Sequence, residues 1–238
     1  KNRIIPYENN NNIIPTTILP HRSTVESINM KEHNSLPDNG SKIFNISINY
    51  PSYETRTKYS LTNSEIKRSV EIIQKNNPDI EIKIGDQVIC TKNITDEIVN
   101  GSRGVVIKFN KFPVVKFLNG YEMEMIPLDY NDEYVKGLSY KKIPIDYAWA
   151  LTIHKCQGMT LDLCIMDIGT KIFANGQTYV ALSRVKSIEG LYLIDFNYKK
   201  IKTSGKVKRF YETFTKTPLT KEEMKSEKKR ILEFINNQ

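Results

Sequence analysis

The chain of 238 residues is long enough for one large domain, or for one domain with a small insertion, and it carries a formal charge of +8. Hydrophobic residues make up 39% of it, which excludes a fully disordered chain, and no apolar run approaches the roughly 20 residues that span a bilayer. Three cysteines without Cys-x-x-Cys or Cys/His spacing exclude a disulfide framework and suggest no structural zinc, so we expect a reducing intracellular compartment (nucleus, cytoplasm or viral factory).

The first predicted elements are a strand and a helix. Residues 1–15 are rich in Asn and Ile and predict an irregular or extended entry. Residues 16–19 predict a short buried strand, and residues 24–36 predict a helix with Ser23 as its N-cap. The chain opens at Lys1 rather than Met and has no signal-like segment, so we expect a fragment of a longer protein.

A second helix is predicted after residues 38–60, a stretch of short β-like runs and polar turns that predicts no single element. Thr62 and Glu65 have the spacing of a capping box, in which each side chain accepts a hydrogen bond from the other's backbone N–H. Apolar residues then follow on one helical face: Ile66, Val70 and Ile73. We expect this helix to end before Pro78.

From residue 82 to residue 127 the apolar period changes to two, which indicates β-strands. Asn100-Gly101 and Asn119-Gly120 predict tight turns, and the second is a strong hairpin signal. The expected strands cover residues 87–91, 105–109, 114–118 and 121–125. Several short strands in so short a stretch predict a small antiparallel barrel.

After residue 142 the pattern changes to continuous apolar runs, which are typical of strands buried on both faces. The runs cover residues 147–153, 163–168 and 190–196. Residues 174–185 predict a helix between the last two runs, and residues 206–214 predict a further helix. This order predicts an α/β domain with a mostly parallel sheet.

The predicted domain therefore has two parts in the chain. Residues 1–80 and residues 143–215 form the α/β domain, and residues 81–142 form the inserted small β-barrel. The C-terminal segment, residues 216–238, is predicted to form a helix over residues 221–234.

The positive charge is concentrated near the C-terminus. Residues 199–238 hold 12 Lys or Arg and 5 Asp or Glu, and so carry seven of the eight excess charges. The other 198 residues are nearly neutral, with 23 basic and 22 acidic residues. Net charge is therefore a weak argument for nucleic-acid binding by the body of the chain.

The stretch most informative about chemistry is residues 151–160 (LTIHKCQGMT). It leaves a predicted strand and breaks into polar residues, and ligands of open α/β sheets bind at the carboxyl ends of strands. His154 and Lys155 are adjacent donors suited to phosphate oxygens. Gln157 can both donate and accept, and Gly158 lets the backbone approach a ligand closely. From composition alone, an ordinary polar connection is an equally good interpretation.

A second stretch, residues 176–185 (GQTYVALSRV), predicts a helix that ends in an arginine. Gln177 and Arg184 lie at i and i+7 and share a helical face. The Arg184 guanidinium could bind a phosphate through two hydrogen bonds. The alternative is that it caps its own helix, where the dipole favours a cation, and for this stretch alone that alternative is the stronger.

Taken together, the two stretches resemble a known family. Residues 152–160 closely resemble motif V, and residues 176–184 motif VI, of superfamily-one DNA helicases of the Pif (petite integration frequency) type and their RecD-like relatives. Residues 18–29 resemble the family's motif IV, and residues 84–106 resemble the start of its inserted barrel. The resemblance covers most of residues 16–215.

The resemblance implies a fold and a set of site residues. The implied fold is the second RecA-like motor domain of a helicase, a mostly parallel α/β sheet with an inserted small Src-homology-3-like antiparallel β-barrel. Contacts to the phosphates of single-stranded DNA are implied for Thr152, His154 and Lys155. Nucleotide-binding positions are implied for Arg22, Gln157, Gly158, Gln177 and Arg184. Among these, Arg184 would be catalytic, as the arginine finger that reaches the γ-phosphate.

Other residues gain an interpretation from the same resemblance. The barrel would contribute DNA contacts from Arg103, Lys108 and Lys116. Cys156 stands where a small Ser is common in the family, and we interpret it as structural because no partner His and acid can be assigned to it. Tyr147 and Trp149 precede motif V and are interpreted as core residues.

The chain departs from the family by an absence. It has no G-x-x-x-x-G-K-[ST] loop to cradle phosphates, and no acidic strand for Mg²⁺ can be assigned. In the full-length protein, ATP and Mg²⁺ would be bound mainly by a first motor domain, while this chain alone would be inactive and would hold no metal. The implied whole is a monomeric ATP-dependent helicase that moves 5′ to 3′ on single-stranded or fork DNA, with no membrane partner.

Two alternatives stay open at this point. A non-catalytic DNA-binding or regulatory module with a helicase-derived fold would also lack the phosphate loop and would suit the basic tail. A RecD-like protein associated with a relaxase or an exonuclease would carry such a domain upstream.

Overall fold

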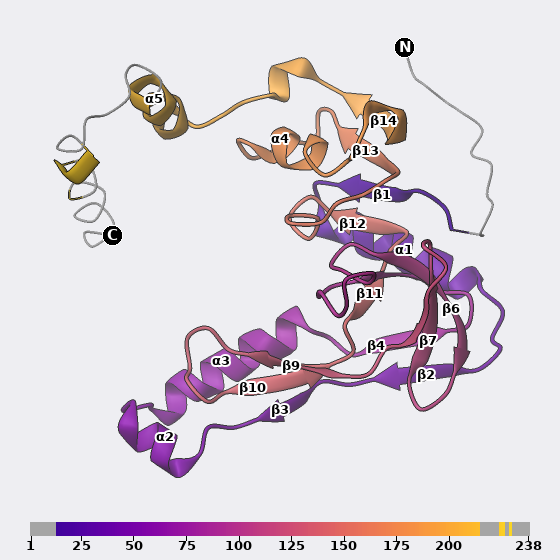
Figure 1. Ribbon diagram of the computed structural model, residues 1–238, viewed down its shortest axis with the longest axis vertical. Coiled ribbons are helices and arrows are strands. Elements are labelled where there is room, and N and C mark those ends of the chain that lie inside the picture. The colour runs from indigo at the N-terminus through magenta and orange to yellow at the C-terminus, as the bar shows by residue number, and fades with distance from the viewer. Residues whose placement is uncertain (1–12, 215–223, 227–228, 230–238) are drawn as a thin grey trace.

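The computed structural model describes residues 13–214, 224–226 and 229 (Figure 1). A parallel sheet and several antiparallel sheets occupy different regions of the molecule, and helix α1 (Arg22–Ser35) lies near their junction. The predicted C-terminal helix over 221–234 falls outside the described residues, apart from residues 224–226 and 229. Most of the predicted extended entry also falls outside them.

The parallel sheet has four strands in the order β12-β1-β13-β14, and each neighbouring pair is parallel. The strands are β1 (Thr16–Leu19), β12 (Ala150–Thr152), β13 (Cys164–Ile168) and β14 (Leu191–Phe196). Its core packs Ile18, Leu151 and Met166 of these strands with Ala181 of helix α4 (Gln177–Leu182). The predicted α/β domain with a parallel sheet is confirmed.

Helix α1 begins earlier than predicted. His21 is its N-cap residue, with extended backbone angles (φ −106°, ψ 131°), and Ser23 therefore lies inside the first turn instead of capping it. The reason is the short connection, because only Pro20 and His21 separate the helix from the end of β1.

The apolar run at 147–153 belongs to two strands, not to one as predicted. β11 (Ile145–Tyr147) pairs antiparallel with β5 (Gln87–Cys90), whereas β12 pairs parallel with β1. Between them, Ala148 N donates to Gln87 O (2.8 Å) and Trp149 O accepts from Thr17 N (2.8 Å). The chain thus crosses from one sheet to the other while staying buried, so its apolar pattern is unbroken.

The larger antiparallel sheet has five strands in the order β11-β5-β6-β7-β8. Besides β5 and β11, its strands are β6 (Arg103–Phe109), β7 (Pro113–Phe117) and β8 (Glu122–Glu124). The predicted succession of short antiparallel strands in this region is confirmed, with the Asn119-Gly120 turn between β7 and β8. Its core includes Val88, Val106, Val115, Phe117 and Met125.

The remaining elements extend the antiparallel part of the molecule. A three-stranded sheet has the order β3 (Ser47–Asn49), β10 (Ser139–Lys142), β9 (Leu128–Asn131), and β2 (Ser41–Phe44) pairs with β4 (Ile80–Lys83). Two helices lie between β3 and β4 in the chain, α2 (Tyr53–Lys58) and α3 (Asn63–Asn76). By strand pairing, the antiparallel part spans residues 41–147, which is wider than the predicted 81–142.

The predicted capping box of α3 is confirmed. Thr62 Oγ1 accepts from Glu65 N (3.3 Å), and Glu65 Oε2 accepts from Thr62 N (2.9 Å). The apolar face of α3 packs with Val135 and Leu138, next to the three-stranded sheet.

The described C-terminal part adds short helices. α4 (Gln177–Leu182) is shorter than the predicted 174–185, and two 3-10 turns cover Ile188–Gly190 and Tyr198–Lys200. α5 (Gly205–Phe214) matches the predicted helix at 206–214.

Candidate functional site

The carboxyl ends of three neighbouring strands meet at one edge of the parallel sheet, because β12, β1 and β13 run in the same direction. β1 leads into His21 and Arg22, and β12 ends at Thr152 and leads into Lys155. The loop after β13 carries Phe173. Ligands of open α/β sheets bind at such an edge.

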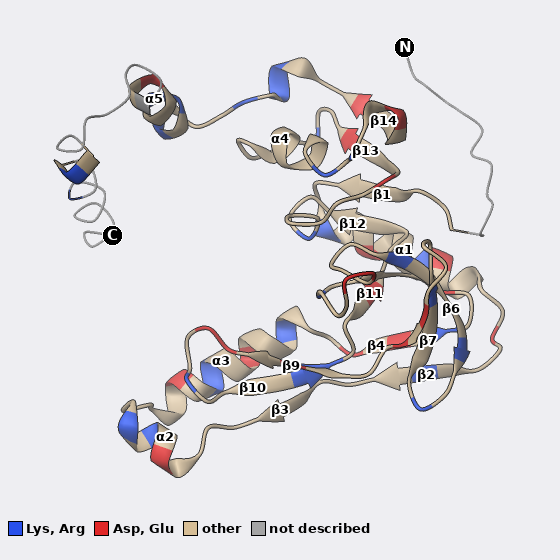
Figure 2. Ribbon diagram, in the orientation of Figure 1, with Lys and Arg blue, Asp and Glu red and all other residues tan. Residues whose placement is uncertain are grey.

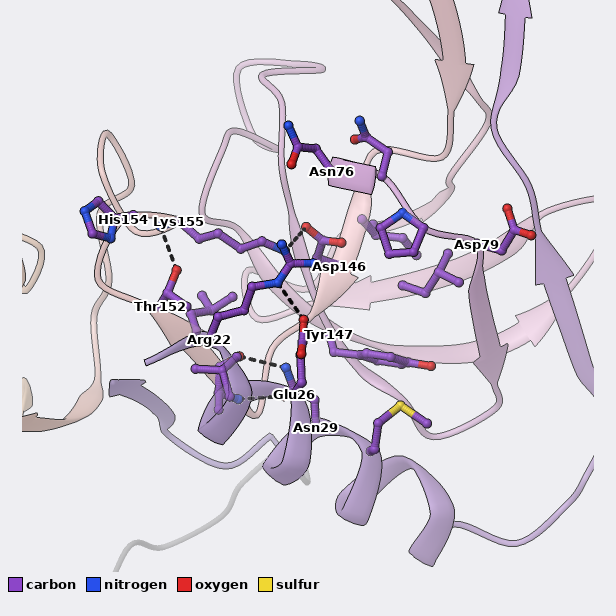
Figure 3. A pocket seen from close by; sticks show the side chains of 18 of the residues that line it. Arg22, Glu26, Asn29, Asn76, Asp79, Asp146, Tyr147, Thr152, His154 and Lys155 are labelled. Carbon is purple, nitrogen blue, oxygen red and sulfur yellow. Dashed lines mark hydrogen bonds and ion pairs between the residues drawn. The ribbon is translucent and has the colours of Figure 1, made fainter. Parts of the chain in front are cut away.

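A pocket of about 870 Å³ lies between this edge and the antiparallel part of the molecule (Figure 3). The parallel-sheet side contributes, among others, Arg22, Glu26, Thr152, His154 and Lys155. The antiparallel side contributes, among others, Asn76, Asp79, Lys142, Asp146 and Tyr147. The three predicted DNA contacts of motif V therefore share one pocket with Arg22.

Tight turns after β12 decide which side chains of motif V reach this pocket. Thr152 Oγ1 accepts from Lys155 N (3.1 Å), and Thr152 O accepts from Cys156 N (3.1 Å). Gly158 follows with a left-handed φ of +83°, a conformation that strains residues with a Cβ. The turns leave His154 and Lys155 exposed and bury Cys156.

Cys156 is a structural residue, as predicted. Its side chain is fully buried in the core of the parallel sheet. Burial raises the pKa of its thiol to about 12, with the nearby Cys164 adding to the effect. A protonated, inaccessible thiol is a poor nucleophile.

Each of two pocket cations is paired with a carboxylate. Lys155 Nζ lies 3.1 Å from Asp146 Oδ2, and Arg22 Nε lies 2.6 Å from Glu26 Oε1. The two cationic side chains are 54% and 58% exposed, so these pairs contribute little stability. Lysines, arginines and carboxylates are interspersed along the described chain (Figure 2). The pocket lining likewise contains residues of both charges.

Arg184 lies outside the pocket lining and is folded back on its own helix. Its Nε donates to Val180 O (3.0 Å), and its other nitrogens donate to Met159 O (3.3 Å) and Ser183 Oγ (2.9 Å). The contact with Val180 is the helix-capping arrangement considered above. The contact with Met159 ties the end of α4 to motif V.

No protein-family model matches the chain. The ATP-dependent DNA helicase PIF1 of Xenopus laevis is 35% identical over 216 residues, which cover 86% of this chain and 31% of that protein. The crystal structure of the Pif1 helicase from Candida albicans matches with a TM-score of 0.63 and 28% identity, over 89% of this chain and 52% of that chain. The chain is homologous to the Pif1 helicases. It spans about a third of the Xenopus relative and about half of the Candida structure.

The fold also matches Pif1 from Bacteroides in complex with ADP-AlF3 and single-stranded DNA. That likeness has a TM-score of 0.56 and 23% identity, over 91% of this chain and 48% of that chain. The resemblance read from the two motif stretches is thus confirmed by whole-chain comparison in sequence and in fold.

Gln177, for which the Pif1 resemblance implies a nucleotide contact, is held by the protein's own backbone. Its side chain is buried, and Oε1 accepts from the backbone N–H groups of Phe173 and Ala174 (3.2 Å each). Its Nε2 is buried without a hydrogen-bond partner among the described residues. Gln177 therefore holds the loop between β13 and α4, while Gln157 and Gly158 are exposed.

Arg103, expected to contact DNA, is buried. The residue is 5% exposed, and Nη1 donates to Ile14 O (3.3 Å), so the side chain is turned into the molecule. The physical reason is the position of Arg103 at the start of β6, beside the chain that enters β1. Lys108 and Lys116 are exposed, and their contacts stay predictions.

Sequence reasoning missed two aromatic residues of the pocket, His21 and Phe173. The signal was present, since each follows the carboxyl end of a buried strand. Tyr147, interpreted as a core residue, lines the pocket while its hydroxyl donates to Glu81 O, and burial raises its pKa. Trp149 is buried, as predicted.

Neither a metal cluster nor a membrane segment occurs in the described part of the chain. No group of three or more His, Cys, Asp or Glu side chains gathers there in a way that could hold a metal ion. No helix within the same residues is long and apolar enough to cross a bilayer.

Proposed function

We propose that the chain is the C-terminal motor domain of a Pif1-type, ATP-dependent DNA helicase that moves 5′ to 3′ along single-stranded DNA. The observation that carries the proposal is the gathering of Arg22, Thr152, His154 and Lys155 in one pocket at the carboxyl edge of the parallel sheet. The names of the relatives support it, since the Xenopus protein is an ATP-dependent DNA helicase and the Bacteroides structure holds single-stranded DNA. Such a protein acts on DNA inside a cell.

The pocket would hold the backbone of the strand. Thr152 Oγ1 already accepts a hydrogen bond from Lys155 N, so its hydroxyl hydrogen is available for a phosphate oxygen. Arg22, for which the resemblance implied a nucleotide contact, is reassigned to the same strand because it lines the same pocket. Lys155 and Arg22 would exchange their carboxylate partners for DNA phosphates. The exchange is inexpensive because both pairs are exposed to water.

Arg184 would act on the nucleotide at the cleft between two motor domains. In the full-length protein, ATP and Mg²⁺ would be held mainly by the first motor domain. The reaction would transfer the γ-phosphoryl group of ATP to water. Within the described residues the Arg184 guanidinium contacts only neutral acceptors, and charged phosphate oxygens form stronger hydrogen bonds to guanidinium than carbonyls do. Arg184 therefore fits the finger, whereas buried Gln177 fits a positioning role.

The five-stranded sheet β11-β5-β6-β7-β8 would serve as the Src-homology-3-like barrel of this family. It contributes part of the other side of the pocket through β11, which carries Asp146. Exposed Lys108 and Lys116 on β6 and β7 are its candidate contacts to the strand or to the fork junction. We further propose that the helicase works as a monomer.

The test separates the two motif roles in the full-length protein. Arg184→Ala should lower DNA-stimulated ATP turnover by about 10³–10⁵-fold, because a finger has that effect in related chemistry, and should leave DNA affinity largely unchanged. Lys155→Ala should weaken single-strand binding and reduce its salt slope by about 1. Phosphate release and fluorescence anisotropy measure the two effects.

The reverse pattern, with Arg184→Ala losing DNA and Lys155→Ala losing turnover alone, would refute the assignments. The 238-residue chain alone should show negligible phosphate release with or without DNA. If the full-length protein also binds DNA without any ATPase activity, the non-catalytic module is the correct alternative.

A further inference from the structure

An exposed phenylalanine stands at the rim of the pocket. Phe173 is 62% exposed, although the preceding Ile172 is only 3% exposed and packs in the core of the parallel sheet. Single exposed apolar side chains are common, and what distinguishes this ring is that it lines a pocket that also holds cations.

The Phe173 ring is stacked on that of His21. Their centroids are 5.2 Å apart and their planes differ by 26°. The pairing follows from topology, because His21 comes directly after β1, Phe173 comes after β13, and these strands are parallel neighbours. The two rings form a stacked pair with the Phe173 ring mostly exposed, and we call this pair the His21–Phe173 platform.

The backbone on both sides of the platform is anchored. Phe173 N donates to the buried Gln177 Oε1 (3.2 Å), and the carbonyl of Ile172 accepts from Lys200 Nζ (2.9 Å). On the other side, His21 is the N-cap residue of α1, and its carbonyl accepts from Val25 N (3.3 Å). A platform held in this way loses little conformational freedom when a planar ligand stacks on it.

We propose that the His21–Phe173 platform stacks one nucleobase of the single strand whose phosphates the pocket binds. This inference rests on the proposed function and deepens it. Both rings line the pocket together with Arg22, Thr152 and Lys155, so a phosphate and its neighbouring base would be held at the same time. A helicase needs such contacts to be independent of sequence, and every base has a face that stacks.

The deciding experiment measures binding of a fluorescein-labelled oligo-dT to the full-length protein over a range of salt concentrations. Phe173→Ala should weaken binding about 5- to 140-fold, which corresponds to about 1–3 kcal/mol per stacked base. Its salt slope should equal that of the wild type, because no phosphate contact is lost. Phe173→Tyr should keep the binding of the wild type. Tyr134 is an aromatic residue that is 84% exposed and lies outside the pocket lining, so Tyr134→Ala should leave binding unchanged.

A series of strands, each with an abasic site at a different position, tests whether the loss of DNA binding comes from a lost base contact. In the wild type, an abasic site at one particular position of the strand should weaken binding, and in Phe173→Ala the same abasic site should cause no further loss. Equal binding by wild type and Phe173→Ala, or equal losses with intact and abasic strands, would overturn the platform. Loss of ADP binding by Phe173→Ala with unchanged DNA binding would assign the platform to the nucleotide's base and would also overturn it.

Failure of the proposed function gives a different result. In that case the wild type itself would show no salt-dependent binding of single-stranded DNA, whatever stands at residue 173. Thermal unfolding of Phe173→Ala serves as the folding check, and we expect it unchanged because the ring is mostly exposed.

Discussion

Two cationic side chains of the pocket form exposed ion pairs, which the proposed DNA strand could replace. Lys155 is held by Asp146 from the opposite side of the pocket, and Arg22 is held by Glu26 one helical turn along α1 (Figure 3). Exposed ion pairs contribute about 0–1 kcal/mol, and a DNA phosphate gains in addition from counterion release at low salt, so it could take the place of the carboxylate. The carboxylates therefore keep the cations in place without blocking them.

Asp146→Asn should tighten binding of single-stranded DNA by up to about fivefold, because Lys155 no longer has to leave a carboxylate and one repulsive charge is removed. Anisotropy titrations at low salt measure the gain. Asp162→Asn is the matched control, since Asp162 pairs with Lys186 at 2.6 Å outside the pocket lining. If Asp146→Asn raises DNA affinity by as much in the Lys155→Ala background, the pairing of Asp146 with Lys155 is not the cause of the gain.

At the scale of elements, the antiparallel wall of the pocket depends on helix α3. The end of α3 carries Asn76, which lines the pocket, and its start is fixed by the Thr62–Glu65 capping box. The hydrogen bonds from Thr62, side chain and backbone, lower the pKa of Glu65. A lowered carboxyl pKa means that the stabilising contribution is present above the ordinary glutamate value and is lost as the pH falls through the folded value.

Thr62→Ala should reduce the free energy of unfolding by about 0.5–2 kcal/mol, the usual effect of losing a threonine N-cap. Urea unfolding measures it, and Thr62→Ser should retain most of the stability because it keeps the hydroxyl. The difference in the free energy of unfolding between wild type and Thr62→Ala should be largest near neutral pH. It should become smaller as the pH falls and Glu65 becomes protonated. A constant difference down to pH 3 would contradict this role of Glu65.

At the scale of the whole molecule, two of the contacts that join the parallel part to the antiparallel part stand out. Gly101, with a left-handed φ of +101°, lies so close to motif V that a Cβ there would come within 3.2 Å of Met159 Cβ. The second contact is fully buried, where His33 Nδ1 of α1 and Asp86 Oδ1 before β5 share a hydrogen bond of 2.8 Å. Burial raises the pKa of Asp86, against the opposing effects of Lys83 N and His33.

His33→Ala should lower the free energy of unfolding by about 1–3 kcal/mol or more, because it leaves a buried carboxyl of Asp86 without that partner. Denaturant unfolding measures the loss, and His154→Ala, an exposed histidine, is the control with no expected effect. An equal effect of both substitutions would exclude a junction role for His33.

The raised pKa of Asp86 gives this junction a defined pH dependence. A raised carboxyl pKa contributes stability that is fully present below the ordinary aspartate value and is lost as the pH rises through the folded value. In Asp86→Asn that part of the pH dependence should be absent.

The sequence by itself determined the family, the order of most elements and the motif V side of the pocket. Those signals are local: residues 152–160 and 176–184 are contiguous, and the capping box spans four residues. Apolar runs identified β1 and β13, which are mostly buried, and also β14, which lies at the sheet edge and is half-buried or exposed instead of buried on both faces.

Only the tertiary structure decided the partners of these residues. It divided the apolar run 147–153 between two sheets, turned Arg103 toward Ile14, and gave Gln177 a loop to hold. It also brought His21 and Phe173 into stacking contact across 152 positions of the chain. The physical reason is that burial and contact depend on which distant segment packs against a residue, and local spacing carries no record of that choice.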